Sequence, residues 1–150
     1  MTKTKISIVL SVLLSMAAFS AQADVESAKV LAKKYTGIAK TINPDFVPSA
    51  EDGKAFYNRE VGVKGKKVSC SACHTSNPAD VGKNIVTNKR IKPLSPAVNP
   101  KRFTNLDKVE EKFVQHCNEI TGSDCTAQDK ANYITYLMTV TEPTPKASSK

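Results

Sequence analysis

The five residues from Cys70 to His74 constrain this chain more than any other stretch. They read Cys-Ser-Ala-Cys-His, so two thiols are separated by two residues and an imidazole follows the second thiol directly. This motif is typical of covalent attachment of a c-type haem. In that chemistry Cys70 and Cys73 add to the two vinyl groups of one porphyrin, and His74 binds the iron as the proximal ligand. The motif therefore predicts one covalently attached haem c.

Three other sites use two cysteines at this spacing: a zinc site, a thiol redox pair and a structural disulfide. A zinc site needs a second pair of ligands at similar spacing. Cys117 and Cys125, the remaining cysteines, are separated by seven residues and make a poor second pair. A thioredoxin-like pair needs a βαβ context, and the sequence near Cys70 has no such pattern. The adjacent His74 favours haem attachment over all three.

The first 23 residues have the pattern of a secretory signal peptide. Lys3 and Lys5 form a positive amino-terminal region, and an apolar stretch runs from Ile6 to Phe19. Ala21-Gln22-Ala23 is an A-x-A cleavage site, which predicts that the mature chain starts at Asp24. The apolar stretch is short for a membrane span, although an uncleaved anchor is the alternative. Export together with a c-type haem predicts a periplasmic protein, in a compartment where disulfides persist.

The predicted mature chain has more basic than acidic residues. Residues 24–150 contain 20 basic and 14 acidic residues, so their formal charge is +6 before haem propionates are counted. Such an excess can steer an acidic redox partner protein, and it is equally consistent with an ordinary solvated surface. Aromatic residues do not alternate with the basic ones as they do in nucleic-acid sites. We therefore expect no nucleic-acid partner, and we expect no membrane span after cleavage.

Helical periodicity and capping residues predict an all-α fold with a loop-rich middle segment around one haem. We expect a monohaem cytochrome c domain over residues 24–140 and a flexible tail over residues 141–150. Residues 61–68, rich in lysine and glycine, and residues 75–104, with four prolines, are predicted to be loops. The predicted helices are Val25–Ile42, Ala50–Arg59, a segment between Thr104 and Gly122, and Ala127–Val140.

The long 75–104 loop has no core of its own. A loop of this length needs something to organise it, and the edge of a haem would do so. Four basic side chains are candidates for pairing with haem propionates, with ordinary solvated charge as the alternative for each: Lys89, Arg90, Lys101 and Arg102.

The predicted helix before Gly122 contains His116, the second histidine of the chain. Thr104 with Asp107 forms a capping pair at its start, and Gly122 is a suitable terminator. One apolar stripe follows this helix, and His116 is expected to face inward on it. The stripe consists of Val109, Phe113, His116, Cys117 and Ile120. An inward histidine is usually a hydrogen-bonded core residue, but a haem iron accepts a sixth ligand, and we interpret His116 as that ligand in the ferric state.

Met138 is the competing candidate for the sixth ligand. It is the one methionine left after cleavage and lies 64 residues after the motif histidine, a separation seen in methionine-ligated cytochromes c. It falls inside the predicted helix Ala127–Val140, which Thr126 and Asp129 cap. A methionine at helical spacing usually fills a core, so His116 is the preferred ligand.

Cys117 and Cys125 are expected to form a disulfide in an oxidising compartment. It would tie the end of the His116 helix to the start of the next one. Simple stapling of a small domain, worth on the order of 2 kcal/mol or more, is the first interpretation. The second is that a bridge beside His116 fixes how far this side chain approaches or leaves the iron. A redox-active disulfide is the third.

These residues resemble the cytochrome c″ family, the bis-histidine monohaem cytochromes of methylotrophic bacteria. The resemblance covers nearly all of the mature chain, and the pair His116-Cys117 is its most specific part. The matching stretches are Tyr35–Ala39, Asp52–Lys54, Cys70–Thr75, Val81–Thr87, Lys101–Thr104 and the segment from His116 to Cys125. A glycine of the family's turn is Asn88 here, and asparagine tolerates a positive φ. The chain is more distantly similar to the oxygen-binding sphaeroides haem proteins, which have asparagine at the position of His116.

The resemblance implies a class I cytochrome c fold, His74 and His116 as axial ligands, and a Cys117–Cys125 disulfide. It also implies that His116 leaves the iron on reduction and takes up a proton. An imidazole has an unperturbed pKa of about 6.5, so the freed side chain can bind a proton near neutral pH. We therefore expect a periplasmic electron carrier rather than an enzyme.

Two other functions use the same residues. The ferrous site that His116 leaves would admit oxygen, nitric oxide or carbon monoxide, so gas binding or nitric oxide detoxification is the alternative function. A peroxidase would need an open ferric site with a distal acid–base group, and the one spare histidine is already interpreted as an iron ligand.

Overall fold

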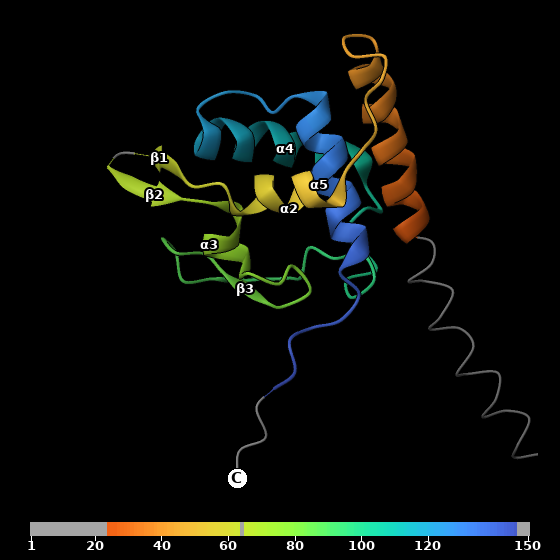
Figure 1. The fold of residues 1–150 in the computed structure, drawn as a ribbon. Helices are drawn as coiled ribbons and strands as arrows, with labels where there is room; N and C mark the ends of the chain where they lie inside the picture. The colour runs from red at the N-terminus through yellow and green to blue at the C-terminus, as the bar shows by residue number, and fades with distance from the viewer. Residues whose placement is uncertain (1–23, 64, 147–150) are drawn as a thin grey trace, which may run out of the picture.

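The structure is a computed structural model that describes residues 24–63 and 65–146. The signal peptide expected over residues 1–23 lies outside the described residues, as do Lys64 and residues 147–150. Helices make up most of the regular structure, which confirms the expected all-α class (Figure 1). They are an N-terminal helix over residues 24–40, α2 (Ala50–Asn58), α3 (Cys70–His74), α4 (Leu106–Thr121) and α5 (Ala127–Thr139).

The hydrophobic core is built around the crossing of α2 and α5. At Gly53 a Cβ atom would lie 2.1 Å from the backbone oxygen of Asn132, so this close approach requires glycine. The side chain of Asn132 also accepts a 2.8 Å hydrogen bond from the backbone N–H of Ser49. The N-terminal helix and the loop before α4 add further side chains, and the largest fully buried apolar ones are Leu31, Tyr57, Phe103, Ile134 and Leu137.

Local capping residues set the ends of α2, α4 and α5. α2 begins after Ser49, and α5 begins with a capping box between Thr126 and Asp129, as predicted. α4 ends at Gly122, which has the left-handed φ of 76° that favours glycine. The predicted helix ends otherwise differ from the observed ones by one or two residues, because fraying makes such ends indefinite.

The start of α4 corrects one prediction. Asn105, not Thr104, is its N-cap. The side-chain oxygen of Asn105 accepts the backbone N–H of Lys108 at 3.0 Å, whereas the Thr104 hydroxyl donates to the carbonyl of Lys101 at 3.2 Å. Both residues are good caps, so the sequence alone did not distinguish between them.

Residues 61–63 and 66–68 pair as a β-hairpin, where we predicted a loop. β1 (Val61–Val63) pairs antiparallel with β2 (Lys66–Val68), with Gly65 at φ 77° in the turn. Strands of three residues are too short to show an alternating pattern of apolar and polar residues, so the sequence did not predict this hairpin.

A second short hairpin lies inside the predicted 75–104 loop. β3 (Gly82–Lys83) pairs antiparallel with β4 (Arg90–Ile91). Asn88 in the connecting turn has φ 59°, the positive value that we expected asparagine to tolerate. The rest of the segment is turns and loops, as predicted.

Residues near the C-terminus form hydrogen bonds with the rest of the fold. Within the predicted flexible tail over residues 141–150, Thr144 donates two hydrogen bonds to the carboxylate of Asp80, at 2.8 Å from its backbone N–H and 2.7 Å from its hydroxyl. Asn77 donates to the carbonyl of Glu142 at 3.1 Å. These bonds involve single residues far apart in the sequence, which no local pattern predicts.

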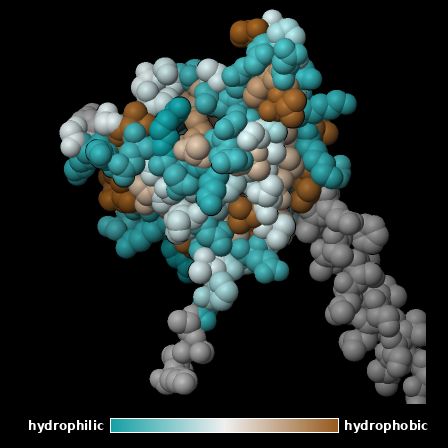
Figure 2. All heavy atoms as spheres, viewed as in Figure 1, coloured by the Kyte–Doolittle hydropathy of each residue, from teal (hydrophilic) through white to brown (hydrophobic). Residues whose placement is uncertain are grey.

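The visible surface is mostly hydrophilic, with separate apolar patches (Figure 2). Among the described residues, no helix is both long and apolar enough to cross a membrane.

Candidate haem-binding site

The site is a cavity, partly open to solvent, that is lined by residues from α2, α3, α4 and α5 and from the loop before α4. Cys70 and His74 come from α3, and His116 and Cys117 come from α4. Its walls are largely apolar and aromatic, with contributions from Phe56, Val109, Phe113, Ile120 and Tyr133. The structure therefore brings together two histidines that are 42 residues apart in the sequence.

The short helix α3 presents His74 to this cavity. Tyr57, which is fully buried on α2, directs its hydroxyl to the carbonyls of His74 at 3.0 Å and Thr75 at 2.6 Å. Burial lowers the pKa of His74 to about 4, and the charges of Arg102 and His116 act in the same direction. The imidazole is therefore neutral at physiological pH, which is the form that binds a metal.

The two motif cysteines, Cys70 and Cys73, are free thiols in the structure. Both are half-buried and neither forms a disulfide. Burial raises the pKa of the Cys70 thiol to about 11, whereas redox-active thiols have lowered pKa values. Cys70 lines the cavity, and Cys73 lies beside it on the same turn of helix. The described part of the chain also has no group of three or more metal-ligating side chains, so it offers no support for the zinc alternative.

His116 lines the cavity from α4, but it is more exposed than we predicted. We expected it to be buried in the core. The apolar stripe of α4 instead faces the cavity, which is open to solvent. Partial burial lowers the pKa of His116, with Lys112 and Arg102 adding to the effect and Glu119 opposing it. A lowered pKa keeps this imidazole in its neutral, metal-binding form.

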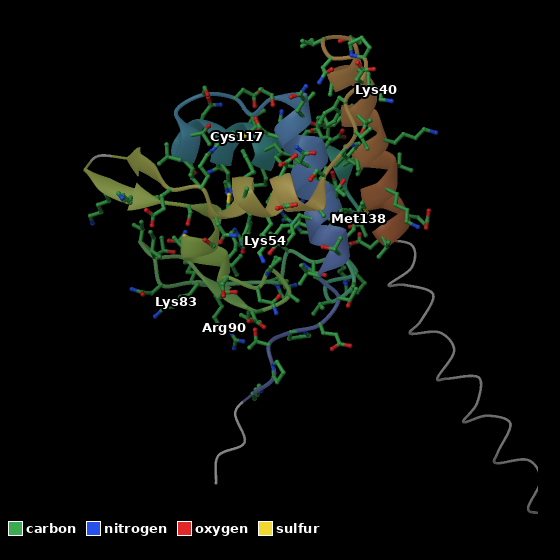
Figure 3. The ribbon with its side chains drawn as sticks, in the orientation of Figure 1. Lys40, Lys54, Lys83, Arg90, Cys117 and Met138 are labelled. Atoms are coloured by element: carbon green, nitrogen blue, oxygen red, sulfur yellow. A yellow bond between two sulfur atoms is a disulfide. The ribbon has the colours of Figure 1, made fainter. Side chains whose placement is uncertain are left out.

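Met138, the competing ligand, is not among the residues that line the cavity. It is half-buried on α5 and packs against the hydrophobic core (Figure 3). This is the role that its position on a helical stripe indicated.

Comparisons with known proteins identify the family of this chain. Residues 43–137 match the family described as a domain of unknown function, DUF1924. Cytochrome c″ of Methylophilus methylotrophus is 56% identical over 126 residues, which cover 83% of this chain and 88% of that protein. The chain belongs to the cytochrome c″ family. It is a monohaem c-type cytochrome, and its cofactor is haem c, an iron porphyrin attached covalently.

Solved structures of cytochrome c″ and a relative have the same fold. The crystal structure of oxidized cytochrome c″ from M. methylotrophus has a TM-score of 0.77 and 55% identity, covering 80% of this chain and 99% of that one. Its solution structure, described as giving insights into haem-ligand detachment, has a TM-score of 0.74 and 54% identity, covering 81% and 99%.

The more distant relative is the cytochrome c-type protein SHP of Cereibacter sphaeroides. It is 37% identical over 89 residues, which cover 59% of this chain and 68% of that protein. The structure of oxidized SHP, described as an oxygen-binding cytochrome c, has a TM-score of 0.65 and 32% identity, covering 73% of this chain and 94% of that one.

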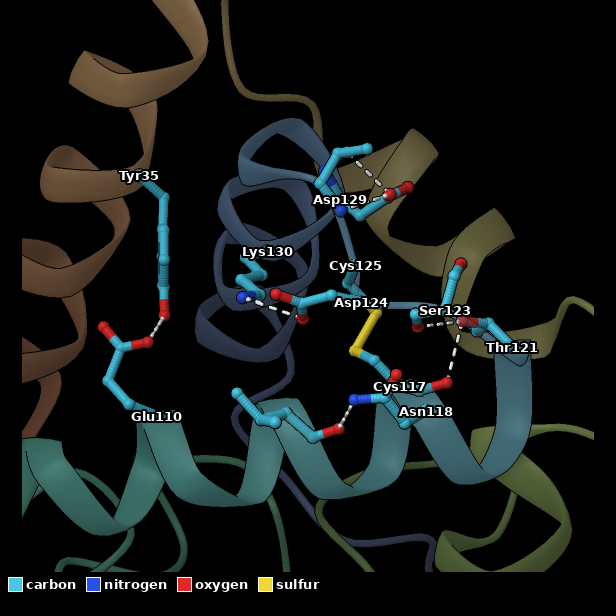
Figure 4. Close-up of a disulfide and its surroundings, with 12 residues drawn as sticks. Tyr35, Glu110, Cys117, Asn118, Thr121, Ser123, Asp124, Cys125, Asp129 and Lys130 are labelled. Carbon is cyan, nitrogen blue, oxygen red and sulfur yellow. Dashed lines mark hydrogen bonds and ion pairs between the residues drawn. A yellow bond between two sulfur atoms is a disulfide. The ribbon is translucent and has the colours of Figure 1, made fainter.

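The residue directly after His116 forms a disulfide. Cys117 and Cys125 are bonded, with their Cα atoms 5.5 Å apart (Figure 4). The bridge connects the last turns of α4 to the start of α5, as we expected. Both cysteines line the cavity wall, so the disulfide lies next to the site as well as between the two helices.

Arg102 is the one of our four propionate candidates that lines the cavity. Its Nε atom is buried and has no hydrogen-bond partner among the described residues. A buried donor without a partner is rare in proteins, and a carboxylate is the natural group to satisfy a guanidinium. Together with the two thiols and two neutral imidazoles, this orphan donor fits the chemistry of haem c.

Two contacts behind the site were not evident in the sequence. Glu110 on α4 accepts hydrogen bonds from Tyr35 and Lys34 of the N-terminal helix. Lys130 on α5 is buried, forms an ion pair with Asp124 at 3.3 Å and lies over the ring of Tyr35. Lys130 and Tyr35 both lie on apolar helix faces. Their charged partners, Asp124 and Glu110, are evident only from the tertiary fold.

Proposed function

We propose that this protein is a periplasmic electron carrier, with haem bound to Cys70 and Cys73. His74 and His116 would hold the iron in the ferric state. The observation that supports this ligand pair is that one cavity is lined by both neutral imidazoles, whereas the thioether of Met138 packs elsewhere. The signal-like residues 1–23 support export to the periplasm.

Haem c, when bound, supplies an iron that accepts and releases one electron. On reduction of that iron, His116 would detach from it and take up a proton from the solvent. A ferric porphyrin core has a net positive charge that favours binding of a basic imidazole. Reduction removes this charge, so the bond between the iron and His116 would become weaker. The solution structure of the Methylophilus relative is described in terms of haem-ligand detachment, which supports the same step here.

The residues around His116 influence both its protonation and its detachment. Lys112 and Arg102 oppose its protonation, and Glu119 favours it. The neighbouring disulfide restrains the end of α4, so detachment needs movement of the His116 side chain or of a short length of helix.

The spectra of His116→Ala in both redox states test the ligand assignment, with Met138→Leu as the matched control. We expect the ferric spectrum of His116→Ala to change from low-spin to high-spin and that of Met138→Leu to stay low-spin. An unchanged ferric spectrum in His116→Ala, or a high-spin one in Met138→Leu, would show that the assignment is wrong.

Binding of a diatomic gas, with nitric oxide detoxification as one form of it, is the second candidate function. It is favoured by the likeness to SHP, whose structure is described as that of an oxygen-binding cytochrome c. His116 would then leave a ferrous site open to oxygen, nitric oxide or carbon monoxide. Tight binding of these gases to the reduced protein, with turnover supported by an electron donor, would favour this function over simple electron transfer.

A further inference from the structure

The positive charge of this protein is concentrated in one segment. Residues 81–106 contain six basic residues and no acidic residue. The other residues of the predicted mature chain contain 14 basic and 14 acidic residues, so they are formally neutral. The whole excess of +6 therefore lies in about a fifth of the chain, which is not what an evenly solvated surface would show.

The hairpin formed by β3 and β4 displays half of this charge. Lys83, Lys89 and Arg90 are all exposed, and none of the ion pairs between described residues involves them. Charges that are not neutralised by neighbours are the ones that produce a field beyond the surface. Figure 3 shows Lys83 and Arg90 at the same end of the molecule.

Two apolar side chains stand in the middle of these charges. Ile85 is 53% exposed and Val86 is 83% exposed. The turn that presents them is braced by two hydrogen bonds, in which the side-chain oxygen of Asn84 accepts the backbone N–H groups of Val86 at 2.9 Å and Thr87 at 2.8 Å. The turn thus exposes two apolar side chains between Lys83 on one strand and Lys89 and Arg90 at the start of the other.

This hairpin is packed directly against the haem-attachment helix. At Gly82 a Cβ atom would lie 2.3 Å from the carbonyl oxygen of Cys73 and 3.0 Å from the Cα atom of His74. The first strand of the hairpin is therefore in backbone contact with the two residues that we propose to hold the haem and its iron. A protein bound to the hairpin would lie close to the redox centre.

From these observations we infer that the β3–β4 hairpin is the docking surface for an acidic electron-transfer protein. The inference rests on the proposed function as an electron carrier. Lys83, Lys89 and Arg90 would steer the partner's carboxylates, and Ile85 and Val86 would form the apolar centre of a small, transient interface. Rim charges of this kind act mainly on the association rate.

The test uses reduced flavodoxin, an acidic electron-transfer protein, as the probe and the complete haem-loaded cytochrome as the acceptor. The variant Lys83→Glu/Arg90→Glu is compared with Lys33→Glu/Lys40→Glu on the N-terminal helix, which has the same change in net charge. Figure 3 shows Lys40 at the opposite end of the molecule from Lys83 and Arg90. At low ionic strength we expect the hairpin variant to be reduced at least about tenfold more slowly than the control, and we expect high salt to abolish the difference.

The apolar centre has its own matched pair. Val86→Ser should slow reduction of the cytochrome by flavodoxin at high salt. Val47→Ser should not, because this side chain, although 73% exposed, lies outside the hairpin. Equal effects of the hairpin and control variants in both experiments would overturn the inference.

A binding measurement separates this inference from the proposed function. Oxidised flavodoxin is titrated into the ferric cytochrome, so that no electron moves, and amide NMR shifts are recorded. Shifts centred on residues 82–91 would support the docking surface even if the spectra show that His116 is not the ligand. Shifts centred on other residues would overturn the inference. Binding of the hairpin to anionic phosphatidylglycerol vesicles, with no binding to flavodoxin, would also overturn it.

Discussion

The hydroxyl of Tyr35, on the N-terminal helix, donates a hydrogen bond to the carboxylate of Glu110 on α4 (Figure 4). Lys34 donates to the same carboxylate at 2.7 Å. The disulfide of Cys117 fixes α4 two turns further along. His116 therefore lies on a length of helix that is attached to the rest of the fold at both ends, which limits how far it can follow or leave an iron.

Replacing Glu110 tests this attachment. Although burial pushes the pKa of Glu110 upward, the hydrogen bonds from Lys34 and Tyr35 outweigh it and lower the pKa. We expect Glu110→Gln to reduce the free energy of unfolding by about 1 kcal/mol, since a charged acceptor is lost from a partly exposed site. Urea unfolding measures this change, and Glu111→Gln, at the exposed neighbouring residue, should change stability by less than about 0.5 kcal/mol. Equal losses in the two variants would contradict the role of Glu110.

Removing the disulfide distinguishes its two structural interpretations. We expect Cys117→Ser/Cys125→Ser to lose on the order of 2 kcal/mol or more of stability, because the unfolded chain gains freedom. Since the bridge is next to His116, we also expect a smaller low-spin fraction in the ferric spectrum. A loss of stability with no spectral change would mean that the bridge is only a staple.

The hydroxyl of Tyr57 supports the backbone around His74. Tyr57→Phe leaves the carbonyls of His74 and Thr75 without this donor, so we expect a loss of about 1–3 kcal/mol of stability. Tyr136→Phe is the matched control, because the hydroxyl of this neighbouring core tyrosine has no hydrogen-bond partner among the described residues. Thermal unfolding followed by circular dichroism compares the two, and an equal effect would contradict a specific role for Tyr57.

Acid should destabilise the fold through both histidines. The pKa of His74 is lowered from 6.5 to about 4, and the pKa of His116 is also lowered. The unfolded chain therefore binds more protons than the folded chain between these values, so stability rises with pH in this window. We expect the free energy of unfolding to fall as the pH is lowered from about 6.5 towards 4. Stability that stays constant or increases over this range would contradict the neutral, buried state of His74.

Local signals made much of this fold and site predictable. The Cys70 to His74 motif, the caps of α2 and α5 and the termination of α4 at Gly122 each depend on residues close together in the sequence. The cavity was foreseeable only in part, because His116 was placed on the correct helical face but in a more buried environment. Tertiary contacts were not foreseeable, since nothing near Glu110 or Asp80 in the sequence indicates that they bind Tyr35 and Thr144.

Reduction of the wild-type protein with simultaneous spectroscopy and proton counting is the most direct test of redox-linked ligand loss. The ferric protein should be low-spin and bis-imidazole, the ferrous protein should be five-coordinate and high-spin, and an unbuffered solution should lose protons to the protein as it is reduced. A ferrous protein that stays six-coordinate and low-spin, with no proton uptake, would contradict the release of His116.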